Sequence, residues 1–358
     1  MAPGTRLPDD APRAARAGEA LDTERLAAYL RTALGTDGAV IVSQFPGGHS
    51  NLTYLVETAT GDLVLRRPPF GNTVRTAHDM TREYRILSAL APVFPPAPRP
   101  VHLCEDETVI GAPFYLMERR RGAVIRAALP PGPGLDPAAA DRLCRALIDT
   151  LADLHHIDYR AVGLGDFGRP EGYVERQVQG WARRFRAAET EPVPAMEAVA
   201  DWLERHRPAE SGAAIIHNDF KFDNLIVDPA DPGRIVAVLD WEMATVGDPL
   251  LDLGAAIAYW VEPGDPEPMR RLAMGPTTAP GMWTRAQLLA AYRDRTGTDP
   301  GDFRFYVVFG LFKLAVILQQ IYARYVRGAT RDERFAGMNR AVAVLADQAR
   351  GTIDKGVG

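Results

Sequence analysis

The sequence predicts an α+β protein with two lobes, a small antiparallel β-sheet followed by a larger, mainly helical lobe. Three observations lead to this prediction. Short apolar segments typical of strands are concentrated between residues 40 and 118. A connector rich in proline and glycine follows at 122–134, and beyond it most apolar residues recur with helical spacing. The 358 residues are also many for one core, which fits two lobes with a ligand cleft between them.

The first lobe is expected to open with a helix. Residues 23–34 have helical apolar spacing, and Asp22 or Thr23 can cap them at the N-terminus while Gly35 ends the helix. Residues 1–20 precede this helix and lack any apolar period, so they predict a flexible N-terminal arm.

A five-stranded sheet is expected to fill the rest of this lobe, which we place at 21–120. A helix over 76–90 should pack on the sheet. The last strand, 114–118, is expected at the edge of the sheet, where it leads into the hinge. The strands are expected at 40–45, 52–58, 63–67, 101–104 and 114–118.

The second lobe is placed at 121–358. Asp136 and Pro137 supply the cap and the first-turn proline of its first long helix. The most apolar stretch, 305–321, is interrupted by Lys313 and predicts a buried core helix rather than a membrane span. Three short strands are expected within 213–240, and helices at 136–155, 172–188, 194–206, 250–261, 284–295, 303–327 and 332–353.

Composition excludes several classes of function. A net charge of −5 offers no basic surface for nucleic acid. The two cysteines, Cys104 and Cys144, predict neither a disulfide framework nor a cysteine-based zinc site. The N-terminus has no apolar core of a signal peptide, so we expect a cytoplasmic protein without a membrane partner. Composition predicts nothing about the oligomeric state.

One segment carries the candidate chemistry, residues 215–242, which read IIHNDFKFDNLIVDPADPGRIVAVLDWE. His217, Asp219 and Asn224 lie on a loop between two short strands, and Asp240 ends the next strand. Phosphoryl transfer from ATP needs a base at the acceptor hydroxyl and oxygen ligands for Mg²⁺. Asp219 can be the catalytic base, and Asn224 and Asp240 the metal ligands. A single loop aspartate is usually a turn or cap residue, but this ordered set is specific.

The segment resembles the aminoglycoside phosphotransferase and choline kinase superfamily, which has the protein-kinase-like fold. VLDWEMATVGDPLLDLG, at 238–254, is most similar to the branch related to kinase domains attached to acyl-CoA dehydrogenases. The resemblance extends over about residues 25–330. It implies the same roles for Asp219, Asn224 and Asp240, and a supporting role below them for 247–249 and Asp252.

Three residues need separate interpretation. The superfamily often has glycine after the motif histidine and histidine two residues after the base, whereas this chain has Asn218 and Lys221. Lys221 beside the base is therefore a second catalytic candidate, since a cation there can stabilise the transferring phosphate. We interpret Asp252 as a buried aspartate at a helix start that holds backbone amides.

The nucleotide side begins at the loop between the first two strands, where Gly47, Gly48, Ser50 and Asn51 are candidate phosphate contacts. Such a Gly-Gly turn is also common in ordinary hairpins.

The third strand offers an arginine where kinases usually have lysine. Alternation places Val64 and Arg66 on one face, so Arg66 is expected at the phosphates with Glu83 as its partner. Arg67 competes for this role. Backbone groups near Met117 to Arg119 are expected to bind the adenine of ATP.

The acceptor is expected to be a small molecule, because only about ten residues separate Asp240 from the next helix and no activation segment is visible. Residues 255–330 hold six acidic and nine basic side chains. They also hold aromatic residues, most of which we expect in the core. This mildly basic, apolar composition favours a hydroxyacyl group, such as one on coenzyme A, over a polycationic aminoglycoside as the acceptor. An aminoglycoside-modifying kinase and a nucleotide-binding pseudokinase scaffold remain the alternatives.

Overall fold

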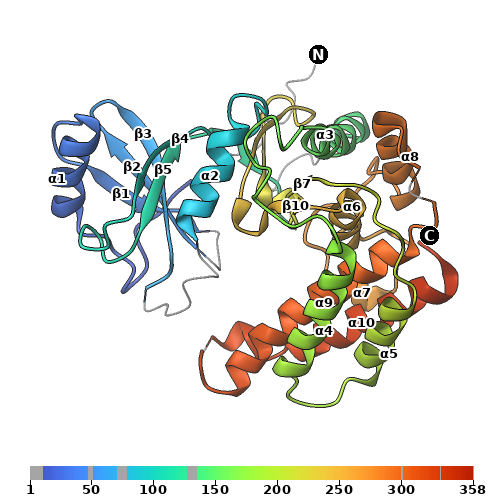
Figure 1. The fold of residues 1–358 in the computed structure, drawn as a ribbon. Helices are drawn as coiled ribbons and strands as arrows, with labels where there is room; N and C mark the ends of the chain where they lie inside the picture. Colours follow the sequence, from blue (N-terminus) through green and yellow to red (C-terminus); the bar gives the residue numbers. More distant parts are fainter. Residues whose placement is uncertain are drawn as a thin grey trace.

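The computed structural model describes residues 11–46, 51–70, 79–126, 135–299, 301–330 and 332–357. They form the two lobes that the sequence predicts, a β-sheet lobe and a larger helical lobe joined along one side (Figure 1). The predicted α+β class is confirmed.

The sheet of the first lobe contains five antiparallel strands in the order β1-β2-β3-β5-β4. The prediction that the last strand lies at the edge is wrong. β5 lies between β3 and β4 because β4 pairs along its outer side and takes the edge. The strands are β1 (Ile41–Gln44), β2 (Leu52–Thr58), β3 (Gly61–Arg67), β4 (Pro100–Cys104) and β5 (Phe114–Glu118).

Two helices flank this sheet at the positions that the sequence predicts. α1 (Thr23–Leu34) is capped by the Asp22 side chain and ends at Gly35, whose φ of +66° suits glycine. α2 (Met80–Leu90) is capped by Asp79 and buries Glu83 together with its apolar face.

The segment before α1 is attached to the sheet from residue 11 onward. Arg13 and Gln44 exchange backbone hydrogen bonds, and the Gln44 side chain contacts Arg16 and Glu19. Within the predicted flexible arm, Arg13, Arg16 and Glu19 thus contact the edge strand β1.

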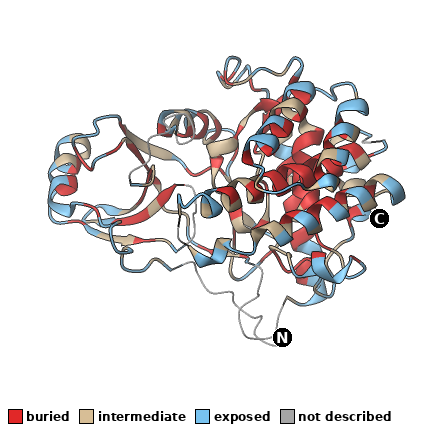
Figure 2. Ribbon diagram, turned by 90° about the horizontal axis from the view of Figure 1, so that it is seen from below, coloured by how far each residue is buried: buried red, intermediate tan, exposed pale blue. Residues whose placement is uncertain are grey.

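The second lobe is built mainly from helices. Figure 2 shows that the buried segments concentrate among these helices. α9 is long and apolar enough to cross a membrane, but 72% of its most apolar window is buried, as expected of a core helix. The helices are α3 (Pro137–His155), α4 (Tyr173–Ala188), α5 (Pro194–Arg205), α6 (Pro249–Ala258), α7 (Glu267–Arg270), α8 (Arg285–Thr296), α9 (Arg304–Val326) and α10 (Met338–Lys355).

Short strands connect these helices to the region between the lobes. β8 pairs with β9 as a hairpin, and β6, within the predicted connector, joins β8 on its other side. β7 pairs with β10, a strand that the sequence did not predict. These strands are β6 (Ala123–Val124), β7 (Ala214–Ile216), β8 (Leu225–Val227), β9 (Ile235–Val238) and β10 (Thr245–Gly247).

Candidate active site

The motif residues meet where these short strands end. The loop after β7 carries His217 to Asn224, and Asp240 follows β9. The Leu239 N–H donates to the Asn224 carbonyl at 2.7 Å, which fixes Asn224 beside Asp240. Asn224 and Asp240, 16 positions apart in the sequence, thus share one site because β8 and β9 form a hairpin.

Asp219, the predicted base, has three side-chain partners. Its Oδ1 accepts a hydrogen bond from the Tyr259 hydroxyl at 2.6 Å. Its Oδ2 lies 3.1 Å from Lys221 Nζ and accepts from Asn224 Nδ2 at 2.8 Å. The predicted pairing of Lys221 with the base is present in the structure, whereas Tyr259 was not identified from the sequence.

His217 links the loop that carries Asp219 to the segment that carries Asp240. Its Nε2 lies 2.8 Å from the Leu239 carbonyl, and its Nδ1 accepts from the Asp219 N–H. A carbonyl accepts only and an amide donates only, so we assign the neutral tautomer that carries its proton on Nε2. His217 is fully buried, and it joins the backbone next to Asp240 with that of Asp219.

The turn before the base is held from below by Asp252. The two carboxylate oxygens of Asp252 accept from the backbone amides of His217 and Asn218 at 2.7 and 2.6 Å. Burial tends to raise the pKa of Asp252, but hydrogen bonds from the His155 side chain and the His217 backbone amide help to hold it below its usual value. Asp252 holds amides of the catalytic loop rather than those of its own helix, which Asp248 caps.

The backbone conformation of Asn218 explains why asparagine can replace the glycine that the superfamily often has after the motif histidine. Its φ is +66°, a left-handed conformation that glycine and asparagine tolerate better than other residues. Asp240 has the same φ, and within the described ranges these two are the only non-glycine residues of positive φ. Backbone strain of this kind is typical of functional sites.

Arg66, and not Arg67, faces the site. Arg66 Nη2 donates to Asp240 at 2.7 Å, and its Nε lies 3.2 Å from Glu83. Burial lowers the pKa of Arg66, but Glu83 and Asp240 outweigh this, and the net pKa lies well above the usual value. Arg67 points to the opposite face of β3 and donates to the carbonyls of Pro68 and Ile110.

Asn51 joins the two lobes rather than lining the nucleotide cleft. Its Nδ2 donates to Glu83 at 2.9 Å and to Glu242 at 2.8 Å. Burial raises the pKa of Glu83, against the lowering effect of Arg66. Asn51 therefore holds Glu83, and Glu83 in turn positions Arg66. The predicted Gly47, Gly48 and Ser50 lie outside the described residues.

A cleft of about 950 Å³, including space open to solvent, lies between the lobes. Val64 and Met117 supply apolar lining suited to a purine, and Asn224 and Asp240 line the same cleft. The Glu118 N–H donates to the Arg99 carbonyl, so that predicted backbone donor is already used. The lining also includes Phe45, Thr53, Arg66, Arg119, Arg120, Arg121, Asp223 and Leu239.

A second pocket, of about 800 Å³ with its solvent-open space, is lined in part by Asn218, the residue before the predicted base, and is strongly basic. Its cations are Arg82, Arg169, Arg176, Arg184 and Lys313. None of them forms an ion pair with a carboxylate among the described residues, although Glu242 lies in the same lining.

Four of the five cations of this pocket lie outside residues 255–330, on which the predicted acceptor class was based, and the aromatic side chains of that range are mostly core, as expected. Arg169, Arg176 and Arg184 recur at intervals of seven and eight, close to two helical turns, and that spacing was the available signal.

Comparisons with known proteins agree with this geometry. The phosphotransferase enzyme family matches residues 41–289. Acyl-CoA dehydrogenase family member 10 of Mus musculus is 38% identical over 320 residues, covering 88% of this chain but only 30% of that protein. The predicted resemblance to the phosphotransferase family and to the acyl-CoA-dehydrogenase-related branch is confirmed.

Solved structures extend the comparison. A protein from Ralstonia eutropha, provisionally identified as an aminoglycoside phosphotransferase, is 35% identical with a TM-score of 0.79, covering 94% of this chain and 99% of that one. A choline kinase from Cryptosporidium parvum shares the fold at 12% identity and a TM-score of 0.63, covering 94% and 98%.

Proposed function

Because this chain belongs to the phosphotransferase enzyme family and is a small-molecule kinase, we propose that it transfers the γ-phosphate of ATP to a hydroxyl group of an anionic acceptor. One observation carries the proposal: the Asp219 carboxylate accepts a hydrogen bond from Asn224, which lines the interlobe cleft with Asp240 and Arg66, while Asn218, next to Asp219 in the chain, lines the basic pocket. In the proposed step the acceptor oxygen bonds to the γ-phosphorus while the bond to the β–γ bridging oxygen breaks. The hydroxyl proton passes to Asp219 and ADP leaves.

The metal-ligand candidates fit Mg²⁺. Asn224 and Asp240 offer an amide oxygen and a carboxylate facing one cleft, and Mg²⁺ is commonly bound by one or two such groups plus phosphate oxygens. When bound, the metal would neutralise charge on the phosphates. Arg66 holds one oxygen of Asp240 at 2.7 Å and lines the same cleft, so its guanidinium can also contact the phosphates.

Lys221 is proposed to support the transferred phosphate. Its ammonium group lies 3.1 Å from Asp219 and 5.0 Å from the centre of the Tyr259 ring, so it is placed beside the base. Negative charge develops on the phosphoryl oxygens and leaving group, and a fixed cation there stabilises that charge.

The charge of the second pocket favours an anionic acceptor. Four arginines and Lys313 would repel a polycationic aminoglycoside and attract a phosphate- or carboxylate-bearing molecule. The similarity to an acyl-CoA dehydrogenase family member supports a hydroxyacyl-CoA as the acceptor. The candidate base and metal ligands are all present at one site, which argues against a pseudokinase scaffold.

The proposal is tested by offering ATP and Mg²⁺ with a panel of 3- and 4-hydroxyacyl-CoAs and a panel of aminoglycosides, and following phosphate transfer by mass spectrometry. We expect phosphorylated hydroxyacyl-CoA with the wild type and none with Asp219→Ala. Transfer only to aminoglycosides would overturn the acceptor class, and equal transfer by both proteins would overturn the role of Asp219.

A further inference from the structure

Tyr259 occupies the place at Asp219 that an acceptor hydroxyl needs. A general base in a kinase accepts a hydrogen bond from the hydroxyl that it will deprotonate. In this structure Asp219 Oδ1 accepts that bond from the Tyr259 phenol at 2.6 Å, while Oδ2 is engaged by Lys221 and Asn224. The one oxygen not committed to the catalytic loop is thus held by a tyrosine.

The phenol keeps its proton in this position. Burial raises the pKa of Tyr259 well above its ordinary value, and the negative charge of Asp219 raises it further. Tyr259 therefore acts as a donor to Asp219 across the neutral pH range, as an alcohol would.

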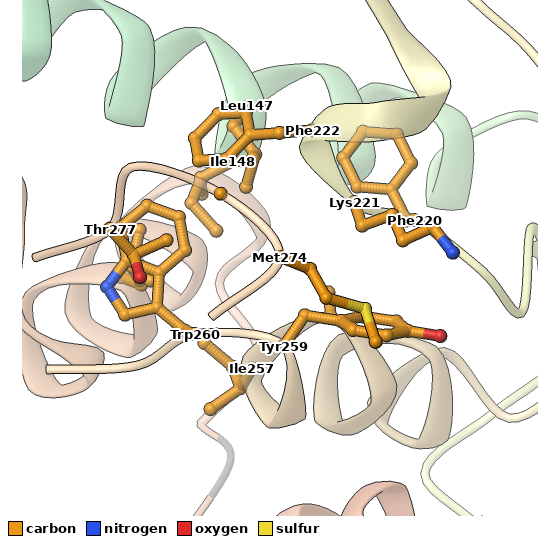
Figure 3. Close-up of a pocket in the computed structure, with 13 residues that line it drawn as sticks. Leu147, Ile148, Phe220, Lys221, Phe222, Ile257, Tyr259, Trp260, Met274 and Thr277 are labelled. Carbon is orange, nitrogen blue, oxygen red and sulfur yellow. The ribbon is translucent and has the colours of Figure 1, made fainter. Parts of the chain in front are cut away.

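The Tyr259 ring borders two small apolar hollows. One, of about 410 Å³ including space open to solvent, is lined by Ile148, Phe222 and Trp260. The other, of about 330 Å³ with its solvent-open space, is lined by Leu314 and Leu318. Tyr259 and Met274 line both hollows. Figure 3 shows the Tyr259 hydroxyl and the Lys221 amine directed to the same side of the first hollow, away from Trp260.

We propose that Tyr259 is a displaceable gate, whose hydroxyl holds Asp219 until the hydroxyl of the acceptor replaces it. Displacement of the ring requires Met274, a flexible side chain that lines both hollows, to shift with it. This inference rests on the proposed function, since it assumes Asp219 as base and an alcohol as acceptor. It implies that Tyr259 competes with the acceptor and keeps water from the base while no acceptor is bound.

A gate and a permanent support for the base predict opposite kinetics. A group that competes with the acceptor raises its KM, so removing that group lowers KM and leaves kcat nearly unchanged. A positioning residue acts in the chemical step, so removing it lowers kcat.

The test compares Tyr259→Phe with wild type. We expect the acceptor KM to fall by about five- to tenfold, in line with the loss of one hydrogen bond to a charged group, with kcat within about twofold. Acceptor-free ATP hydrolysis should rise by a similar factor and disappear in the double variant with Asp219→Ala. Tyr325→Phe is the matched control, because Tyr325 also donates to a carboxylate, that of Glu333, but lies on the surface.

The outcomes separate this inference from the proposed function. If wild type transfers phosphate but Tyr259→Phe loses kcat about tenfold or more at unchanged KM, Tyr259 is a support and the gate is overturned. Unchanged KM and unchanged hydrolysis in a folded Tyr259→Phe overturn the gate as well. If neither protein shows Asp219-dependent turnover with any acceptor or with water, the proposed function fails and the inference falls with it.

Discussion

At the residue scale, Arg66 and Arg67 show how strand alternation separates two identical side chains. The sequence placed Val64 and Arg66 on one face of β3 and favoured Arg66 with Glu83 as its partner, while Arg67 remained a competitor. In the structure two carboxylates from distant segments, Glu83 and Asp240, converge on Arg66. The contact with Asp240 is visible only in the folded arrangement.

Residues without a motif could not be predicted. Tyr259 contacts Asp219 across 40 positions of sequence, and Lys313 stood out only as a charge within an apolar stretch. Lys313 Nζ donates to the Asn218 carbonyl at 2.6 Å, next to the base. Motif spacing carries no information about such contacts between a loop and a helix.

Arg66→Met should weaken both nucleotide binding and the fold. Removing one partner of a buried ion pair leaves Glu83 and Asp240 uncompensated, so we expect the free energy of unfolding to fall by about 3 kcal/mol. The KM for ATP should rise at least about tenfold, measured in steady-state kinetics beside denaturant melts. Arg67→Met is the control, and an equal rise in KM for that variant would contradict the assignment.

Because of Lys313, the free energy of unfolding should depend on pH in the alkaline range. Burial lowers its pKa from 10.5 to about 8, against the raising effect of Asp219 and Asp252, while Lys221 and Arg184 lower it further. Between about pH 8 and 10.5 the unfolded chain holds a proton that the folded protein has released, so the free energy of unfolding should rise with pH in that window.

Lys313→Met should remove this rise. It also removes a desolvation cost of about 3 kcal/mol at pH 7, part of which is offset by loss of the bond to Asn218. Denaturant melts from pH 7 to 10 test this, and a parallel rise in both proteins would contradict the assignment.

At the element scale, the caps and apolar periods predicted most helices to within a few residues. Sheet order was harder, because the sequence shows which segments are strands but not which neighbours pair, and β5 was placed wrongly at the edge. β10 is three residues long and follows a 3₁₀ turn, so it has no periodicity to detect.

The basic face of α4 should bind the acceptor. Arg176→Gln combined with Arg184→Gln is expected to raise the acceptor KM about tenfold or more at low salt, with a smaller effect at high salt because the attraction is screened. The ATP KM should not change. Arg183→Gln, on the same helix but outside the pocket lining, is the control, and an equal effect of that variant would argue for general charge rather than this pocket.

The crossing of α6 and α9 depends on glycine. A methyl group on Gly254 would overlap the backbone of Tyr306, and Gly310 packs against Gly254 from the other helix. Gly254→Ala should lower the free energy of unfolding by about 2–3 kcal/mol. Gly351→Ala in α10, where nothing lies near the added methyl, should raise it by about 0.5–1 kcal/mol. Thermal melts of both variants check this, and a stable Gly254→Ala would contradict the packing.

At the scale of the whole molecule, the two lobes meet through polar contacts around the site. Asn51 bridges Glu83 of the first lobe and Glu242 of the second, and Arg66 reaches Asp240. The sequence predicted both lobes and the catalytic set, because these depend on local pattern and on an ordered motif. The basic pocket and the interlobe bridges depend on side chains from several elements, and sequence order alone does not reveal them.

The central claim is that Asp219 is the base of a phosphoryl transfer to an alcohol. The most direct test is the rate of phosphate transfer from ATP to the best acceptor by Asp219→Asn. Asp228→Asn, which alters a surface aspartate of the same segment paired with Arg234, serves as the control. We expect a loss of kcat of about 10²–10⁴ for Asp219→Asn with ATP binding retained, and a nearly normal rate for Asp228→Asn. A folded Asp219→Asn that transfers phosphate at the wild-type rate would contradict it.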